Sequence, residues 1–322
     1  MKVGVDIAPL VQTRAGTARH VRGLVSKLRG RREVELELLS FGGPGRPSSV
    51  VRDALWYPVG LGLRARRLDV LHCTTFRGPA RAQAPVVLTA HDLAVVRYPE
   101  AFPRWHRMYG RVGLRSILRS ADAVVAVSEF TRDELVDLAN VPRERIRVVP
   151  NGVDPIFRLD GPRSVGEYVL TVATLEPRKN LTRAVEAARI AGVELRVVGT
   201  RGWGGVAVPG WVGEVSDAEL AALYRGARCV LYPSLYEGFG LPVLEAMACG
   251  APVVTSRGTA MEEVAGGAAV LVDPHDAEAI AAGIVEAIER RDELVPRGLA
   301  RASELTWERA ADAVVALWEE LA

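Results

Sequence analysis

Two glutamates that flank the start of a predicted helix form the pattern in this chain best suited to ligand chemistry. Glu237 opens the turn EGFG, a helix is predicted from about Leu241, and Glu245 follows one turn into that helix. Pro242 falls in the first turn, where a proline costs no hydrogen bond. Free backbone N–H groups at a helix start suit a phosphate or sugar hydroxyls, and carboxylates accept hydrogen bonds from vicinal diols. The spacing alone is equally compatible with Glu245 as a solvated helix residue.

Two adjacent cations point to an anionic ligand. Arg178 and Lys179 lie in TLEPRKN, residues 174–180, which follows a predicted strand and precedes a predicted helix. This position is the carboxyl edge of a parallel sheet, where α/β proteins bind ligands. Arginine can hold a phosphate in a bidentate manner and lysine acts as a point charge, so the pair can stabilise a phosphate leaving group. A solvated pair at a helix start is the alternative interpretation.

The first half of the chain offers two further candidates. Gly16 lies in QTRAGTARH, between the first predicted strand and the first helix, where a glycine lets the backbone approach a phosphate closely. A simple helix cap is the alternative. His91 ends the predicted strand PVVLTAH at a carboxyl edge, where a structural histidine is also compatible with the sequence. Asp92 is expected either to orient the His91 ring or to cap the next segment.

Composition limits the class of protein. The 322 residues are 49% hydrophobic and 25% charged, enough apolar material for two domains with separate cores, which excludes disorder. The longest stretch without charged side chains is 12 residues, from Gly202 to Gly213, whereas a membrane-spanning helix needs about 20. The first residues, MKVGVDIAPL, contain no apolar signal core, so we expect a cytoplasmic protein. Three scattered cysteines in apolar surroundings, Cys73, Cys229 and Cys249, are expected to be buried free thiols.

Short β-rich runs alternate with amphipathic helical patterns, which predicts an α/β protein with parallel sheets. The predicted strands cover Lys2–Asp6, Glu33–Ser40, Val70–Cys73, Pro85–Asp92, Ala123–Ser128, Ile146–Pro150, Glu167–Thr174, Glu194–Gly199, Cys229–Ser234, Ala251–Ser256 and Ala268–Asp273. The predicted helices cover Thr17–Arg29, Arg104–Ser120, Phe130–Leu138 with Ser128 as N-cap, Leu181–Ala191, Asp217–Gly226, Pro242–Ala248, Ala277–Arg290 and Trp307–Leu321.

A segment rich in proline and glycine divides this alternation. Residues 150–164, PNGVDPIFRLDGPRS, have no periodicity, and a new series of strands and helices follows them. We therefore predict two Rossmann-like domains facing each other across a cleft. One comprises residues 1–152, with the last helix, 307–322, crossing back onto it; the other comprises residues 153–306.

These motifs together resemble the retaining glycosyltransferases of family 4. EGFGLPVLE is similar to the E-x7-E motif of that family, whose members have the GT-B fold of two Rossmann-like domains. The similarity continues, in the family's order, through RAGTARHV, TAHDL, AVSEFTRDEL, PNGVD, TLEPRKN, the run from Gly213 to Val254, and TWERAADAVVALWEEL. The resemblance therefore covers nearly the whole chain, and TLEPRKN most resembles the mannosyltransferase-like members.

The resemblance implies a role for each matching residue. Glu245 would bind the ribose of a nucleotide-sugar donor, and Glu237 the hydroxyls of the transferred sugar. Backbone groups of Phe239, Gly240 and Leu241 would complete the donor pocket. The loop with Gly16 would lie over the diphosphate, assisted by Arg14, and His91 would contact the transferred sugar. Many members end the strand before TLEPRKN in Gly-Arg, whereas this chain has Ala173-Thr174, so Lys179 is the preferred cation for the diphosphate and Arg178 the second.

The resemblance also implies an activity: transfer of a hexose, with mannose favoured, from a nucleotide diphosphate sugar to a hydroxyl of a glycan or lipid-linked acceptor. GDP-mannose is the favoured donor and a UDP-sugar the second choice. No D-x-D motif occurs, so we expect neither a metal nor another cofactor. The alternatives are a nucleotide-sugar 2-epimerase and a non-catalytic nucleotide-sugar binding protein. An NAD dehydrogenase is disfavoured because no G-x-G-x-x-G follows the strands at Val3 or Tyr168.

Charge is divided unequally along the chain. Residues 1–150 hold 25 Lys and Arg against 14 Asp and Glu, and residues 151–322 hold 16 against 25. The predicted helix 104–120 carries arginines at spacings of three or four, from Arg104 to Arg119. It is either an interfacial helix that docks on an anionic membrane, at the inner face of the cell membrane, or an ordinary solvated helix. Nucleic acid is not expected as a partner, since no aromatic stacking platform accompanies the arginines.

Overall fold

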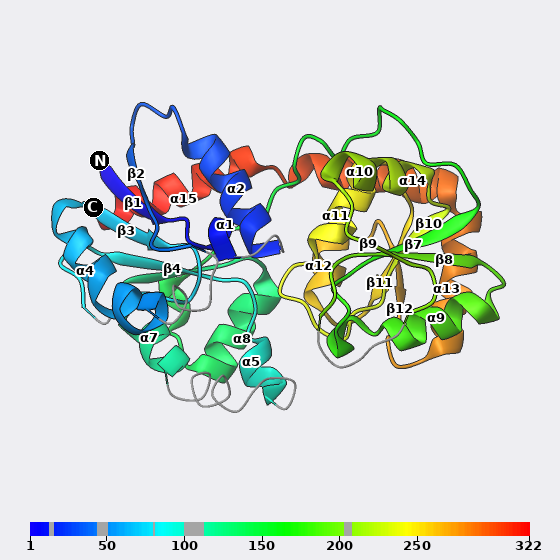
Figure 1. Cartoon of the computed structure of the whole chain (residues 1–322), viewed down its shortest axis with the longest axis horizontal. Helices are drawn as coiled ribbons and strands as arrows, with labels where there is room; N and C mark the ends of the chain where they lie inside the picture. The colour runs from blue at the N-terminus through cyan, green and yellow to red at the C-terminus, as the bar shows by residue number, and fades with distance from the viewer. Residues whose placement is uncertain (13–15, 44–50, 80, 100–112, 203–207) are drawn as a thin grey trace. The chain divides into compact units, whose positions relative to one another are not determined.

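The computed structural model of the chain describes residues 1–12, 16–43, 51–79, 81–99, 113–202 and 208–322. The chain divides into two compact units (Figure 1). Unit 1 comprises Met1–Gly152 and Trp307–Ala322, and unit 2 comprises Val153–Thr306. Within the described residues, no helix is both long and apolar enough to span a membrane.

Unit 1 is built on a six-stranded parallel sheet in the order β2-β1-β3-β4-β5-β6. The strands are β1 (Lys2–Asp6), β2 (Glu35–Leu39), β3 (Val70–Cys73), β4 (Val86–Ala90), β5 (Ala123–Ala126) and β6 (Ile146–Val148). The helices are α1 (Pro9–Gln12), α2 (Gly16–Leu28), the π-helix η1 (Arg52–Gly60), α4 (Leu61–Arg64), α5 (Ala94–Arg97), α7 (Leu114–Ser120), α8 (Glu129–Ala139) and α15 (Trp307–Leu321), with short 3-10 turns η2 (Ala65–Arg67) and η5 (Arg143–Arg145).

Apolar side chains that alternate along the strands give the unit 1 sheet two cores. Helices α2 and α15 bury Leu24 and Trp318 against one face, together with Val5. On the other face, helices that include α4 and α7 bury Leu61 and Leu114. The last helix fits closely on α2, because a Cβ atom added at Gly23 would lie 2.1 Å from Cε2 of Trp307. A glycine at residue 23 is therefore required by this helix pair.

Unit 2 has a second six-stranded parallel sheet in the order β12-β11-β10-β7-β8-β9. The strands are β7 (Tyr168–Val172), β8 (Glu194–Val198), β9 (Trp211–Gly213), β10 (Cys229–Tyr232), β11 (Val253–Ser256) and β12 (Val270–Val272). The helices are α9 (Leu181–Ile190), α10 (Asp217–Gly226), α11 (Leu241–Ala248), α12 (Ala260–Ala265), α13 (Ala277–Glu289) and α14 (Arg291–Glu304), with the 3-10 turn η6 (Pro177–Lys179).

The predicted α/β class with two parallel-sheet Rossmann-like domains is confirmed. Each predicted strand matches an observed strand to within two residues at both ends. Ser128 caps α8 as predicted, accepting a hydrogen bond from the Thr131 N–H at 3.0 Å, and the three cysteines are buried free thiols. The sequence did not predict α1, η1, α4 and α5 in unit 1, or β9, α12 and α14 in unit 2.

The predicted basic helix 104–120 is only partly described. Residues 100–112 lie outside the described residues, and α7 covers the end of the prediction. In α7, Leu114 and Leu118 are buried in the core of unit 1, and Arg115 donates a hydrogen bond to the Leu138 carbonyl at 2.9 Å. This part of the segment is an ordinary helix with its apolar face packed on the sheet.

Candidate functional site

Two loops of unit 2 are joined at the carboxyl edge of its sheet. The loop after β7 contains Arg178, Lys179 and Asn180, and the loop after β10 begins at Pro233. Because β7 and β10 are parallel neighbours, these loops leave the sheet side by side. Asn180, which adopts a left-handed conformation at φ 58°, donates its amide to the carbonyls of Pro233 at 3.0 Å and Pro274 at 2.6 Å. The buried Asn180 therefore holds the two loops together.

Glu237 lies at the centre of a buried polar cluster in these loops. The Lys179 ammonium donates to Oε1 of Glu237, and the Tyr232 hydroxyl donates to the same oxygen at 2.9 Å. Nη1 of Arg178 donates to the other carboxylate oxygen at 3.0 Å, while its Nη2 pairs with Glu176 at 2.8 Å. Glu237 and Lys179 are each 8% exposed. The two predicted phosphate-binding cations and the predicted sugar-binding carboxylate thus belong to one ion-paired cluster.

Electrostatics keep the Glu237 carboxylate ionised. Burial alone would raise its pKa, but the positive charges of Lys179 and Arg178 and the hydrogen bonds from Lys179 and Tyr232 outweigh burial and lower the pKa to about 2. Burial lowers the pKa of the Lys179 ammonium, although the charge of Glu237 opposes this effect. At neutral pH Glu237 therefore accepts hydrogen bonds and does not donate a proton.

The turn after Glu237 leads directly into α11. Gly240 has a φ of 99°, and a Cβ atom there would lie 2.8 Å from Cγ of Met261, so a glycine is required by both conformation and space. Phe239 and Leu241 are buried, at 6% and 9% exposed. Among the described residues no side chain caps the start of α11. The backbone N–H groups of this helix start have the polarity that binds an anion.

Glu245 is buried on α11 at 2% exposed, so the interpretation as a solvated helix residue is wrong. The hydroxyl of Tyr224, on α10, donates to Oε2 of Glu245 at 3.0 Å. Tyr224 thereby fixes the orientation of this carboxylate.

In unit 1, His91 follows β4, and its Nε2 lies 2.9 Å from the carbonyl oxygen of Thr74. A carbonyl only accepts, so Nε2 carries the hydrogen and Nδ1 is left as an acceptor. Burial lowers the pKa of His91, which favours this neutral ring. Asp92 accepts a hydrogen bond from the Ala94 N–H at 3.0 Å and so caps the next segment.

A second histidine, His20, packs against His91. The rings of His20, on α2, and His91 are in edge contact at 4.7 Å between centroids. Nδ1 of His20 lies 2.7 Å from the amide oxygen of Asn151, in the PNGVD segment, and the Trp307 ring is 5.6 Å away. Burial lowers the pKa of His20 well below its ordinary value. His20 therefore contacts His91 and also Asn151 and Trp307, the residues of unit 1 near the two points where the chain passes between the units.

The structure brings some of the predicted residues together and leaves others in separate places. Arg178, Lys179 and Glu237 are in direct contact, and the turn with Phe239, Gly240 and Leu241 connects them to Glu245 along the chain. Gly16 is the exposed first residue of α2, and Arg14 lies outside the described residues. Gly16 and His91 belong to unit 1, and the remaining predicted residues belong to unit 2.

Sequence reasoning missed the residues that hold these groups in place. They are Tyr232 at the end of β10, Asn180 at the end of TLEPRKN, Tyr224, His20 and Asn151. All five lie inside motifs that the resemblance covers, and this was the signal that could have found them. No local pattern marks Tyr224 as the partner of Glu245.

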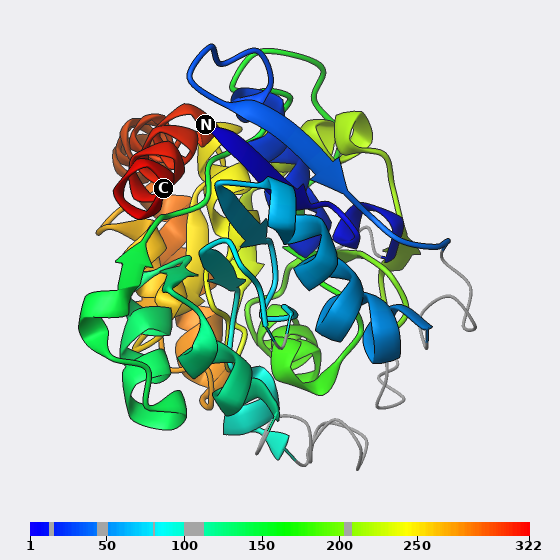
Figure 2. The ribbon, with the colours of Figure 1, turned by 90° about the vertical axis from the view of Figure 1, so that its left-hand side faces the viewer.

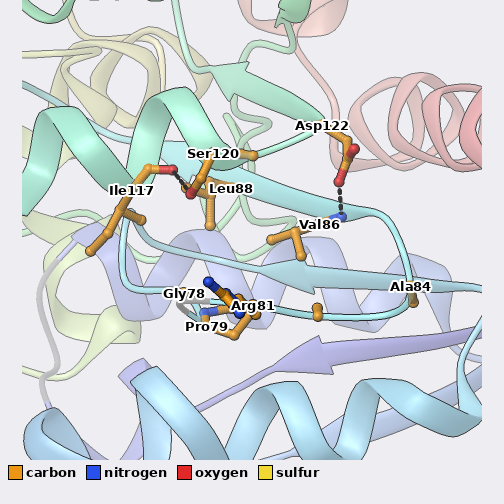
Figure 3. Close-up of a pocket in the computed structure, with 11 residues that line it drawn as sticks. Gly78, Pro79, Arg81, Ala84, Val86, Leu88, Ile117, Ser120 and Asp122 are labelled. Atoms are coloured by element: carbon orange, nitrogen blue, oxygen red, sulfur yellow. Dashed lines mark hydrogen bonds between the residues drawn. The ribbon is translucent and has the colours of Figure 1, made fainter.

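A cavity of about 330 Å³ lies elsewhere in unit 1 (Figure 3). Its lining includes Arg81, Val86, Ser120 and Asp122, near the start of β4 and the end of α7. The Asp122 carboxylate accepts a hydrogen bond from the Val86 N–H at 2.8 Å. This is the amino edge of the sheet, and none of the predicted site residues line the cavity.

Two Rossmann-like units, with Arg178 and Lys179 at the carboxyl edge of the second sheet, define the architecture of a GT-B glycosyltransferase. Solved structures agree on the fold: sucrose-phosphate synthase from Thermosynechococcus elongatus has a TM-score of 0.77 at 21% identity and covers 100% of this chain and 99% of its own. Anabaena Alr3699/HepE in complex with UDP and glucose has a TM-score of 0.74 at 18% identity and covers 100% of both chains.

Sequence comparisons give the family. Residues 14–157 match the description Glycosyltransferase Family 4, and residues 160–297 match Glycosyl transferases group 1. O-antigen chain mannosyltransferase B of Escherichia coli is 31% identical over 94% of this chain and 85% of its own length. The MMP alpha-(1->4)-mannosyltransferase of Mycolicibacterium hassiacum is 32% identical over 82% of this chain and 75% of its own. The chain belongs to glycosyltransferase family 4, as a mannosyltransferase-like member, and is a glycosyltransferase.

Proposed function

We propose that this glycosyltransferase moves a hexose, with mannose favoured, from a nucleotide diphosphate sugar to a hydroxyl of a glycan or lipid-linked acceptor, with retention of the anomeric configuration. GDP-mannose is the favoured donor, because the relatives described above are named as mannosyltransferases. A UDP-sugar is the second choice, because the HepE structures hold UDP and UDP-glucose.

The observation that carries the proposal is the buried cluster of Lys179, Arg178 and Glu237 next to the start of α11. Lys179 and Arg178 are held there by two carboxylates, Glu237 and Glu176, beside a helix start whose backbone N–H groups have the polarity that binds an anion. Fixed cations next to a helix start suit a diphosphate. Glu237, held ionised, suits the hydroxyls of the sugar, and Glu245 suits the ribose.

The cluster also suits the chemistry of leaving-group departure. As the bond between the sugar C1 and the phosphate oxygen breaks, negative charge grows on the diphosphate, and fixed cations stabilise the transition state more than the ground state. The acceptor oxygen then forms its bond to C1 on the same face, and its proton passes to the departing phosphate. These proposed reaction steps need no nucleophile from the enzyme and no metal ion.

His91 is proposed to bind the transferred sugar through Nδ1, which accepts a hydrogen bond because Nε2 is engaged with Thr74. Gly16 is proposed to lie near the diphosphate. We further propose a cytoplasmic enzyme that attaches peripherally to the inner face of the cell membrane, supported by the positive charge of residues 1–150.

A panel of GDP, UDP, ADP and dTDP, with their sugars, tests the proposal by thermal shift, because a ligand of the native state raises the melting temperature. We expect GDP and GDP-mannose to raise it most. Donor turnover with and without a glycan acceptor then separates the alternatives. A transferase yields glycoside and free nucleotide, a 2-epimerase yields an isomer without acceptor, and a binding protein yields neither. Either of the last two results would contradict the proposal.

A further inference from the structure

The helical segment from Val51 to Arg67 in unit 1 is apolar on two sides. Its inner side, with Tyr57, Leu61 and Ala65, is buried in the core. Its outer side carries a row of apolar residues that are all exposed. This outer row is Val51 at 40%, Leu55 at 61%, Val59 at 54% and Leu63 at 54%. A helix that packs on a core normally presents a polar outer face, so the outer row calls for a partner.

The winding of the segment places these residues in one row. They are spaced four apart, and residues 52–60 form a π-helix, with the Leu61 N–H bonded to the Trp56 carbonyl five residues back. Each π-helical residue turns less than an α-helical one. In an α-helix four residues make slightly more than one full turn, so side chains four apart shift steadily around the axis; the wider π turn offsets this shift.

Cations lie at the end of this row. Arg64, Arg66 and Arg67 are all exposed. Arg81 is also exposed, and its backbone carbonyl lies beside Gly62, 2.3 Å from where a Cβ atom would be. Asp53 is the segment's only acidic residue, and it lies 3.5 Å from the Arg77 guanidinium. The exposed charge around the row is therefore mainly positive.

We propose that the outer row, Val51, Leu55, Val59 and Leu63, docks this protein on an anionic lipid bilayer. Figure 2 shows this sky-blue segment on the outside of unit 1. In the proposed arrangement the helix lies flat on the bilayer, with its apolar side chains at the acyl boundary and its arginines at the headgroup phosphates. The inference rests on the proposed function, since it delivers the enzyme to a lipid-linked acceptor. A second copy of the chain is the alternative occupant, which the self-association result of the test below distinguishes.

Co-sedimentation of the full chain with vesicles tests this docking surface. Vesicles of phosphatidylcholine alone are compared with vesicles that also contain phosphatidylglycerol. The test variant is Leu55→Asp with Leu63→Asp, and the matched control is Val285→Asp, an exposed helical valine of unit 2 at 42% exposure. A third variant replaces Arg64, Arg66 and Arg67 with alanine.

We expect the wild type and the control to bind the anionic vesicles, and the outer-row variant to bind at least about tenfold more weakly. The arginine variant should bind weakly and lose the salt dependence of the wild type. The inference is overturned if the wild type does not bind anionic vesicles, or if the outer-row variant binds as the wild type does. It is also overturned if the outer-row substitutions abolish self-association without changing vesicle binding.

Nucleotide thermal shifts of the same proteins separate this inference from the proposed function. Donor binding should be equal in all four proteins. The residues changed in unit 1 lie outside the Lys179 cluster, which belongs to unit 2, and Val285 is an exposed residue of α13 outside that cluster. Failure of every nucleotide to bind the wild type contradicts the proposed function. Vesicle binding tests the docking surface independently of that result.

Discussion

The ion pair of Lys179 and Glu237 predicts strong energetic coupling between two residues far apart in the sequence. Glu237→Gln leaves the buried ammonium of Lys179 with neutral acceptors, the amide oxygen of the new side chain and the Tyr232 hydroxyl, in place of the paired carboxylate. Lys179→Met leaves Glu237 with Arg178 and Tyr232. Breaking one side of a buried pair costs about 3–5 kcal/mol, so we expect the first variant near the upper end and the second near the lower end.

The pKa of Glu237 gives an independent magnitude. A carboxyl with a pKa of about 2 in the folded state and an ordinary value of 4.5 contributes about 3 kcal/mol to the free energy of unfolding at neutral pH. Because the folded pKa is the lower one, this contribution is complete above pH 4.5 and is lost as the pH falls toward 2. Wild-type stability should therefore fall toward that of Glu237→Gln across this range.

Urea unfolding of the wild type, both single variants and the double variant measures the coupling. Circular dichroism and tryptophan fluorescence should be followed together, because coincident curves are needed for a two-state analysis. We expect the double variant to be destabilised by at least about 2 kcal/mol less than the sum of the single variants. Losses that add to within about 0.5 kcal/mol would refute a buried, interacting pair.

The proposed donor site leads to three further predictions. Glu245→Ala should weaken nucleotide binding about 10- to 100-fold in calorimetry, because a charged hydrogen bond to the ribose is lost; unchanged binding would show that the ribose assignment is wrong. Lys179→Ala should lower kcat about 100- to 1000-fold in a transfer assay, and a full transfer rate would remove its role at the leaving group. Gly240→Ala should lower the melting temperature more than Gly258→Ala, since both residues have positive φ but only Gly240 faces a neighbour, Met261; equal shifts would contradict the close contact.

Local pattern was sufficient for most of the fold. Strands such as β1 and β3 match the predicted bounds because runs of buried apolar residues specify them directly. The sequence did not predict η1 because Pro58 and Gly60 interrupt an α-helical pattern. In addition, π winding has no sequence signature of its own. β9 is a three-residue strand, too short to be periodic.

The candidate site was predictable in its parts but not in its pairing. The types and positions of Lys179 and Glu237 pointed to a phosphate and a sugar separately, yet nothing local shows that they contact each other across 58 residues of sequence. That contact follows from β7 and β10 being neighbours in the sheet, which is tertiary information. The same holds for Tyr224 and Glu245, which come from α10 and α11.

The central claim is that unit 2 holds the diphosphate of a nucleotide sugar against the Lys179 cluster. The most direct measurement is isothermal titration calorimetry of the wild type and Lys179→Met with two ligands: the nucleoside diphosphate that stabilises the protein most, and its parent nucleoside. We predict that the substitution weakens diphosphate binding at least about tenfold and leaves nucleoside binding unchanged. Equal binding of the diphosphate by both proteins, or equal weakening of both ligands, would contradict the claim.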